Sequence, residues 1–193
     1  MLPHKQLPNL LTGVRLIGGA VVVPFLIYYL LPQQQDWLNF FLAGIFAAFS
    51  MTDFLDGYLA RRYGLESPLG RALDPIADKF LVCASLIALL AIGKIYFWWV
   101  ILLIGREMCM MSLRQLAALH DISVPVSYLG KIKACFQMFL IIVLIARPTA
   151  SYGFVNWWST SEVLLLSLTL YFALISLYRY SCHFSRQYHK LLN

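Results

Sequence analysis

Four aspartates lie close together in the middle of the chain, in two pairs whose spacing suits helices. Asp53 and Asp56 are three residues apart and Asp74 and Asp78 are four apart, so on a helix each pair shares one face. Four carboxylates carry a charge that two divalent cations would balance, and their oxygens suit hard cations such as Mg²⁺ or Mn²⁺. Two such ions can hold both the attacking and the leaving oxygens of a phosphorus displacement. The stretch therefore predicts a two-metal site for phosphotransfer.

The chain that must position these aspartates has the composition of an integral membrane protein. Its 193 residues are 61% hydrophobic and only 12% charged, with a mean hydropathy of +0.73, whereas a soluble domain has about 25% charged residues. We expect an all-α, polytopic membrane fold that forms one domain, residues 1–193. Apolar runs of about 20 residues predict six transmembrane helices, at 10–31, 37–60, 75–93, 95–118, 128–147 and 157–180.

The distribution of basic residues predicts the orientation in the membrane. Of the 15 Lys and Arg, all but Lys94 and Arg147 fall on or near the side that holds the N-terminus, which indicates a cytoplasmic side. All five tryptophans fall at the opposite helix ends, where aromatic side chains anchor helices. We therefore expect a multi-pass protein of the cell (inner) membrane, with both termini and the aspartates cytoplasmic. The net charge of +6 is spread along the chain, which favours anionic lipid and phosphorylated substrates over nucleic acid as partners.

The segment between the two aspartate pairs is expected to be a polar link, 62–73, that closes a helical hairpin. The two pairs would then face one another. Pro75 suits a first helical position, which makes Asp74 a possible helix N-cap. Gly57 and Ala60 continue the face of the first pair, and their small side chains would let a bulky group approach the backbone.

The first predicted helix opens with three polar residues at a spacing of three. Asn9, Thr12 and Arg15 would stack along one face. Asn9 could also be a simple N-cap, and Thr12 could bond back to the helix backbone. These local explanations do not cover Arg15, because it lies within the apolar run, where a charged side chain is costly.

Four further cations lie on the inner halves of the fourth and fifth predicted helices: Arg106, Arg114, Lys131 and Lys133. Snorkelling to anionic headgroups explains Arg114 and one of the lysines. Arg106 sits deeper in its segment, so a partner such as Glu107 or an anionic substrate is expected there.

The aspartate stretch resembles the signature of a known family, the CDP-alcohol phosphatidyltransferases. The resemblance holds at all eight fixed positions and all spacings of Asp53-x2-Asp56-Gly57-x2-Ala60-Arg61-x8-Gly70-x3-Asp74-x3-Asp78. Residues 8–15, 105–114 and 128–137 are similar to motifs of the subfamily whose acceptor is glycerol 3-phosphate. Residues 108–111 depart from the aliphatic residues usual there and leave the motif intact.

The resemblance implies a fold, a reaction and a set of site residues. The fold is a six-helix membrane domain, generally a homodimer, with a polar cavity open to the cytoplasm. The reaction moves the phosphatidyl group of CDP-diacylglycerol to an alcohol and releases CMP. By motif match, Asp53, Asp56, Asp74 and Asp78 would bind two divalent ions, Mg²⁺ or Mn²⁺, and Asp78 would also be the base. CDP-diacylglycerol would contact Asn9, Thr12, Asp56, Gly57, Ala60, Arg61 and Gly70.

The acceptor is inferred from the remaining positive charge. The chain has more cations than the donor needs, and this excess positive charge suits an acceptor that has its own phosphate. Glycerol 3-phosphate has such a phosphate, and it is also the acceptor of the subfamily that the chain resembles. The residues expected to bind it are Arg15, Arg106, Arg114, Lys131 and Lys133. Inositol phosphate, serine, choline and phosphatidylglycerol remain alternative acceptors. A divalent-cation transporter is a distant alternative, because the outer halves of the predicted helices hold almost no acidic residues.

Overall fold

The structure is a computed structural model that describes residues 18–63, 68–120, 122, 128–148 and 155–192. Within 52–63 and 68–78 it describes the backbone alone. Every regular element in these ranges is helical, which confirms the all-α prediction for the described residues. The α-helices are α2 (Val23–Leu30), α3 (Asp36–Tyr63), α4 (Pro68–Ala91), α5 (Phe97–Leu119), α6 (Tyr128–Ala146) and α7 (Val155–Leu192).

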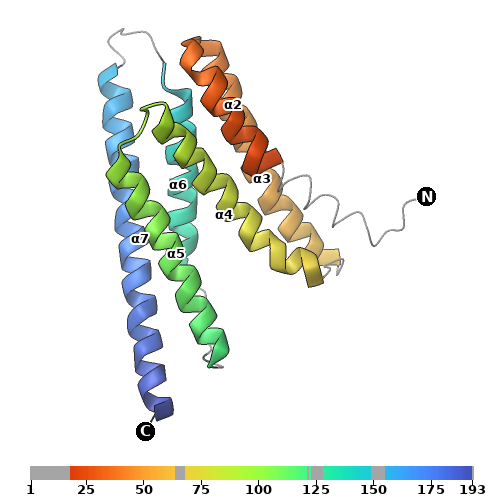
Figure 1. The fold of residues 1–193 in the computed structure, drawn as a ribbon, viewed down its shortest axis with the longest axis vertical. Coiled ribbons are helices and arrows are strands. Elements are labelled where there is room, and N and C mark those ends of the chain that lie inside the picture. Colours follow the sequence, from red (N-terminus) through yellow and green to blue (C-terminus); the bar gives the residue numbers. More distant parts are fainter. Residues whose placement is uncertain (1–17, 64–67, 121, 123–127, 149–154, 193) are drawn as a thin grey trace, which may run out of the picture. The chain divides into compact units, whose positions relative to one another are not determined.

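Each of the six predicted apolar segments corresponds to one helical segment (Figure 1). The first is irregular: a π-helical turn, Gly18–Val22, precedes α2, and a 3₁₀ turn, Leu31–Gln33, follows it. Pro24 lies in the first turn of α2, where its missing N–H costs no helical hydrogen bond.

Two predicted helix ends are wrong. Helix α4 begins at Pro68, well before the expected residue 75, so the link between α3 and α4 is 64–67 and not 62–73. Pro68 is the first helical residue, a position that suits proline because the N–H is unused there. Helix α7 continues to Leu192, well past residue 180. In this extension Phe184 and Tyr188, one turn apart, stack with ring centroids 5.8 Å apart.

The chain divides into two compact units. Unit 1 comprises the described part of Met1–Tyr96 together with Ile141–Trp158, and unit 2 comprises the described part of Phe97–Leu140 and Ser159–Asn193. The aspartate-bearing helices α3 and α4 belong to unit 1. The cations on α5 and on the first half of α6 belong to unit 2. The prediction of a single domain stays a prediction.

The apolar centre of unit 1 is built around α2. Val23, Ile27 and Leu31 are buried and recur every four residues, which places them on one helical face. Helix α2 packs against both α3 and α4, on which Phe46 and Leu86 are completely buried. Burial of these large side chains holds together the part of α3 before its aspartates and the part of α4 after its aspartates.

A polar contact in unit 1 satisfies the carbonyl that follows the end of α6. Asn39 of α3 donates its Nδ2 to the Arg147 carbonyl oxygen at 2.9 Å, and Lys94 Nζ donates to the same oxygen at 3.2 Å. The last carbonyls of a helix have no intrahelical partner and carry partial negative charge, so a lysine there is favourable. The two cations expected on the outer side, Lys94 and Arg147, therefore meet at one helix end.

Unit 2 is held by apolar and aromatic contacts among α5, α6 and α7. Leu103, Leu140 and Ala173 are buried, one on each helix. Phe136 of α6 stacks on Phe172 of α7, with ring centroids 5.5 Å apart and an interplanar angle of 4°. The stacked rings join α6 to α7, and the polar network described below joins α5 to both of them.

The outward faces of the helices carry large apolar side chains, as expected of helices that contact lipid. Exposed examples occur on six helices, at Phe25, Phe40, Ile87, Leu102, Phe139 and Leu164. Two stretches in the described residues, Tyr128–Ala146 and Trp158–His189, are long and apolar enough to cross a membrane. In α3 and α4 the segments whose side chains the structure describes, Asp36–Met51 and Lys79–Ala91, are also apolar but shorter.

Candidate active site

The two aspartate pairs lie on consecutive helices that are joined by a very short link. Asp53 and Asp56 are in α3, Asp74 and Asp78 are in α4, and only residues 64–67 separate the helices. The helical backbone bears out the premise of the spacing argument, because both pairs are within regular helix. Their side chains lie outside the described residues, so the prediction that the pairs face one another stays a prediction.

The interpretation of Asp74 as a helix N-cap is wrong. Helix α4 starts at Pro68, so Asp74 lies in its second turn and Pro75 follows it within the helix. A capping role would have given Asp74 a purely structural task. The backbone position of Asp74 therefore gives it no capping role, and its predicted role as a metal ligand stays a prediction.

A pair of glycines fixes the start of the first helical segment against both aspartate-bearing helices. A Cβ on Gly18 would come within 2.9 Å of the Phe49 ring on α3, and a Cβ on Gly19 within 3.4 Å of Leu81 on α4. Phe49 lies one turn before Asp53, and Leu81 lies three residues after Asp78. The glycines thus allow close packing directly beside the aspartate stretch. The predicted site residues Asn9, Thr12 and Arg15, upstream of the pair, lie outside the described residues.

The other predicted donor-binding residues also lie in the aspartate stretch. The backbones of Gly57, Ala60 and Arg61 are in α3 and that of Gly70 is in α4. Their side chains lie outside the described residues, so their roles stay predictions.

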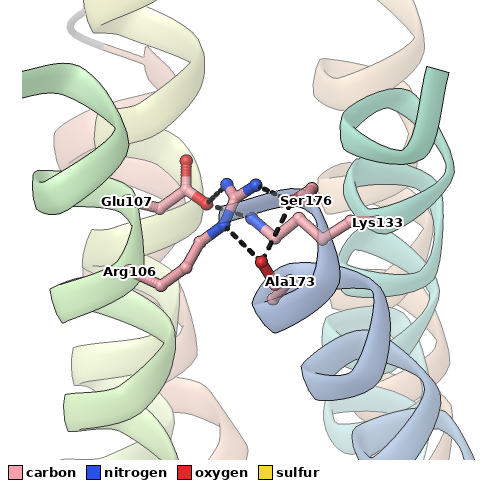
Figure 2. A network of polar contacts seen from close by, with 5 residues as sticks. All are labelled: Arg106, Glu107, Lys133, Ala173 and Ser176. Atoms are coloured by element: carbon pink, nitrogen blue, oxygen red, sulfur yellow. Dashed lines mark hydrogen bonds and ion pairs between the residues drawn. The ribbon is translucent and has the colours of Figure 1, made fainter. Parts of the chain in front are cut away.

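In unit 2, a buried ionic network joins α5, α6 and α7 (Figure 2). Arg106 Nη1 donates to Glu107 Oε1 at 2.7 Å, and Lys133 Nζ donates to the same oxygen. The guanidinium also donates through Nε to the Ala173 carbonyl at 3.3 Å and through Nη2 to Ser176 Oγ. Two cations and one anion leave this group with a net charge of +1 in a low-dielectric interior.

This network confirms that Arg106 has an ionic partner in Glu107. Arg106, Glu107 and Lys133 are 8%, 6% and 3% exposed, so both cations are withdrawn from solvent and each is paired. Burying a charge without a partner is costly, and a shared carboxylate reduces that cost. Headgroup snorkelling is therefore not the explanation for Lys133. It fits Arg114 and Lys131, both of which are exposed.

Sequence reasoning did not predict two members of this network. Ser176 and the Ala173 carbonyl come from α7, far along the chain from Arg106, and neither belongs to a recognisable motif. The only signal was an i, i+3 pair of small residues on an apolar helix. That pattern is common in membrane helices, where small residues allow close packing.

The donor set of the aspartate stretch fits divalent metal ions. Among the side chains that the structure describes, no group of three or more His, Cys, Asp or Glu could hold a metal. The carboxylates of Asp53, Asp56, Asp74 and Asp78 supply oxygen donors only, which is the ligand set of Mg²⁺ and Mn²⁺ rather than of zinc. Chain proximity supports one shared site, because four residues can span no more than about 19 Å between helix ends.

Comparison with known proteins gives the family. Residues 5–176 match the sequence profile of the CDP-alcohol phosphatidyltransferases. A CDP-diacylglycerol–glycerol-3-phosphate 3-phosphatidyltransferase of Rickettsia felis is 38% identical over 148 residues, which cover 76% of this chain and 78% of that protein. The enzyme of the same name from Escherichia coli is 38% identical over 151 residues, 74% of this chain and 78% of that protein.

A relative with a different name matches a longer part of the chain. A cardiolipin synthase (CMP-forming) of Oryza sativa is 35% identical over 196 aligned residues, which cover 92% of this chain and 59% of that protein. The family profile spans both compact units and includes the complete aspartate signature. This chain is therefore a member of the CDP-alcohol phosphatidyltransferase family, whose proteins are integral to the membrane.

Proposed function

We propose that this protein transfers the phosphatidyl group of CDP-diacylglycerol to glycerol 3-phosphate, giving phosphatidylglycerol phosphate and CMP. The observation that carries the proposal is the complete aspartate signature on two consecutive helices joined by residues 64–67. The relatives from Rickettsia felis and Escherichia coli, which cover about three quarters of the chain, support glycerol 3-phosphate as the acceptor. The enzyme is a phosphotransferase of phospholipid biosynthesis.

The residues of the aspartate stretch divide between ion binding and proton transfer. Asp53, Asp56, Asp74 and Asp78 would hold two divalent ions, Mg²⁺ or Mn²⁺, which supply positive charge to the diphosphate oxygens of the donor. The carboxylate of Asp78 takes the proton from the acceptor hydroxyl. The hydroxyl oxygen then bonds to the phosphorus that carries diacylglycerol, and the bond from that phosphorus to CMP breaks.

The donor is recognised by the surrounding small and basic residues. Gly57 and Ala60 leave room for the CDP group against α3, and Arg61 donates to phosphate oxygens. Asn9 and Thr12 contribute hydrogen-bonding groups from the start of the chain. The acyl chains need lipid while the diphosphate needs water and ions, and a site at the cytoplasmic edge of the membrane serves both.

The acceptor phosphate is bound by cations of unit 2, with Arg15 as a further contributor. Arg114 and Lys131 are exposed and attract the dianion, while Arg106 and Lys133 form the buried pair on Glu107. The net positive charge of the buried network complements a phosphorylated acceptor. An acceptor without a phosphate, such as cationic choline or zwitterionic serine, would not use this charge.

The membrane arrangement follows from the positive-inside rule. Six transmembrane helices, both termini cytoplasmic and a polar cavity open to the cytoplasm agree with 13 of the 15 Lys and Arg on one side. Exposed Trp37, Tyr96 and Trp98 lie near helix ends of the opposite side, where they suit the headgroup layer. We propose an inner-membrane homodimer with this topology.

Cardiolipin formation is the second candidate, because a cardiolipin synthase matches 92% of the chain. In that reaction the acceptor would be phosphatidylglycerol. Its headgroup carries one phosphodiester charge, whereas glycerol 3-phosphate carries nearly two. The excess of cations on α5 and α6 therefore favours glycerol 3-phosphate.

An acceptor panel tests the proposal. Purified protein with Mg²⁺ or Mn²⁺ and CDP-diacylglycerol is given glycerol 3-phosphate, phosphatidylglycerol, inositol phosphate, serine or choline, and CMP release is measured. We expect release with glycerol 3-phosphate and its loss on chelation of the metal. Release with another acceptor alone would assign that activity instead. Metal uptake into proteoliposomes without any CMP release would support a transporter.

A further inference from the structure

Gln137 is a buried residue of α6 whose amide nitrogen lacks a protein partner. The side chain is 2% exposed, and its Nε2 makes no hydrogen bond within the described residues. An amide nitrogen can only donate, so what is missing is an acceptor oxygen. A buried donor without an acceptor lowers stability, and such groups in a folded protein call for an explanation.

The position of Gln137 links it to the ionic network of unit 2. It lies four residues after Lys133 on α6, so both side chains leave the same face of the helix. Lys133 is itself 3% exposed and bound to Glu107. The neutral donor is therefore placed one turn along the helix from a buried group with net positive charge.

Three properties together describe the ligand that would complete Gln137. It must offer an oxygen that accepts a hydrogen bond, it must tolerate or need nearby positive charge, and it must be small enough to reach a side chain that is buried on α6. A phosphorylated small alcohol has all three properties, because its phosphate oxygens accept hydrogen bonds and carry negative charge. A lipid acyl chain offers neither a hydrogen-bond acceptor nor negative charge.

We infer that Gln137 is a substrate-binding residue, whose Nε2 donates a hydrogen bond to an oxygen of the phosphorylated acceptor held beside Arg106 and Lys133. The inference rests on the proposed function and extends it, because it adds a neutral donor that the charge pattern did not predict. It also accounts for the unsatisfied amide: the free protein tolerates an unfavourable group that the substrate later satisfies.

The test is Gln137→Met, which keeps the length of the side chain and removes the amide. The KM for glycerol 3-phosphate should rise about tenfold, the loss of one hydrogen bond to a charged group, while the KM for CDP-diacylglycerol stays within about twofold. The unfolding temperature in detergent should be unchanged or higher, because an unsatisfied buried group has been removed. A purely structural glutamine would instead lower the unfolding temperature and leave the KM ratio unchanged.

Ser85→Ala is the matched control in unit 1. Ser85 is completely buried on α4 and its Oγ also lacks a partner in the described residues, but it belongs to unit 1 whereas the ionic network belongs to unit 2. It should keep or raise the unfolding temperature without changing the acceptor KM. Gln137→Glu is a second variant of the same size, and its negative charge should raise the acceptor KM further than Gln137→Met does.

Calorimetric binding of glycerol 3-phosphate separates this inference from the proposed function, because it does not need turnover. About tenfold weaker binding by Gln137→Met supports the inference even if the wild-type protein releases no CMP, an outcome that would overturn the proposed function alone. Equal binding and equal acceptor KM in Gln137→Met and wild type would overturn the inference, and would assign the amide to a bound water.

Discussion

The aspartate stretch of unit 1 and the ionic network of unit 2 place charge in an apolar protein in opposite ways. The four aspartates of this stretch carry charge of one sign, and the basic residues nearest to them in the sequence are Arg61, Arg62, Arg71 and Lys79. The network of Arg106, Glu107 and Lys133 mixes both signs and satisfies most of its charge internally. Like charges in a membrane protein are costly unless external ions balance them, so the first group requires ions and the second does not.

The comparison also separates chemistry from positioning. A set of carboxylates that needs ions to become stable is suited to binding and activating a charged substrate. A network that is already satisfied is suited to holding three helices together and to keeping a modest positive field at a fixed place. Variants of the two regions should therefore fail differently: one in turnover, the other in acceptor affinity and stability.

The largest effect is expected from Asp78→Asn. The amide cannot take the proton of the acceptor hydroxyl, so the rate of CMP release should fall by roughly 10²–10⁴-fold, the usual contribution of a general base. Binding of CDP-diacylglycerol, measured by titration, should remain largely intact. Wild-type turnover in this variant would exclude Asp78 as the base.

The second largest effect is expected in Glu107→Leu, which should lower the stability of the protein. Without the carboxylate two buried cations lose their shared partner, which should cost about 3–5 kcal/mol of unfolding free energy. The measurement is thermal unfolding in detergent.

The double variant Glu107→Leu/Lys133→Met removes one charge of each sign and is the matched control. It should recover part of the lost stability, because only Arg106 then remains charged, with Ala173 and Ser176 as its partners. Equal stability of the single and double variants would show that Lys133 is not held by Glu107.

Smaller effects are expected from Arg106→Ala and Lys131→Ala, and they should differ because Arg106 is buried and Lys131 is exposed. Arg106→Ala should raise the acceptor KM roughly tenfold and also lower the unfolding temperature, since Arg106 bonds to Glu107 on its own helix and to Ala173 and Ser176 on α7. Lys131→Ala should raise the acceptor KM by only about threefold and leave the unfolding temperature unchanged, because the side chain is exposed. The KM for CDP-diacylglycerol should change less in both. An unchanged acceptor KM would remove that residue from the acceptor site.

The smallest effect is expected from Ser176→Ala. The guanidinium of Arg106 loses one of its hydrogen-bond acceptors, which should cost about 1 kcal/mol of unfolding free energy. Ser181→Ala is the control on the same helix, since among the described residues Ser181 Oγ bonds only back to the Leu177 carbonyl. If both variants unfold at the same temperature, the Ser176 hydroxyl is not part of the anchor of Arg106.

The sequence predicted the local features of this protein well and two of its helix boundaries wrongly. Six helical segments followed from apolar runs, and Glu107 was expected beside Arg106 because the two are adjacent. The start of α4 was misplaced because the chain contains two prolines that both suit a first helical position, Pro68 and Pro75. Spacing alone does not say which of two equivalent start signals the helix uses.

What the sequence by itself determined is the family signature of the aspartate stretch, from which its chemistry is predicted. All eight positions of that signature lie within 26 residues on two neighbouring helices, so residue types and helical periodicity suffice to group them. Tertiary structure alone decided that Lys133 shares a carboxylate with Arg106 and that Ser176 and Ala173 complete the network. It also showed that Gln137 is buried with an unsatisfied donor. These residues are distant in sequence, and packing among three helices, which no local pattern encodes, brings them together.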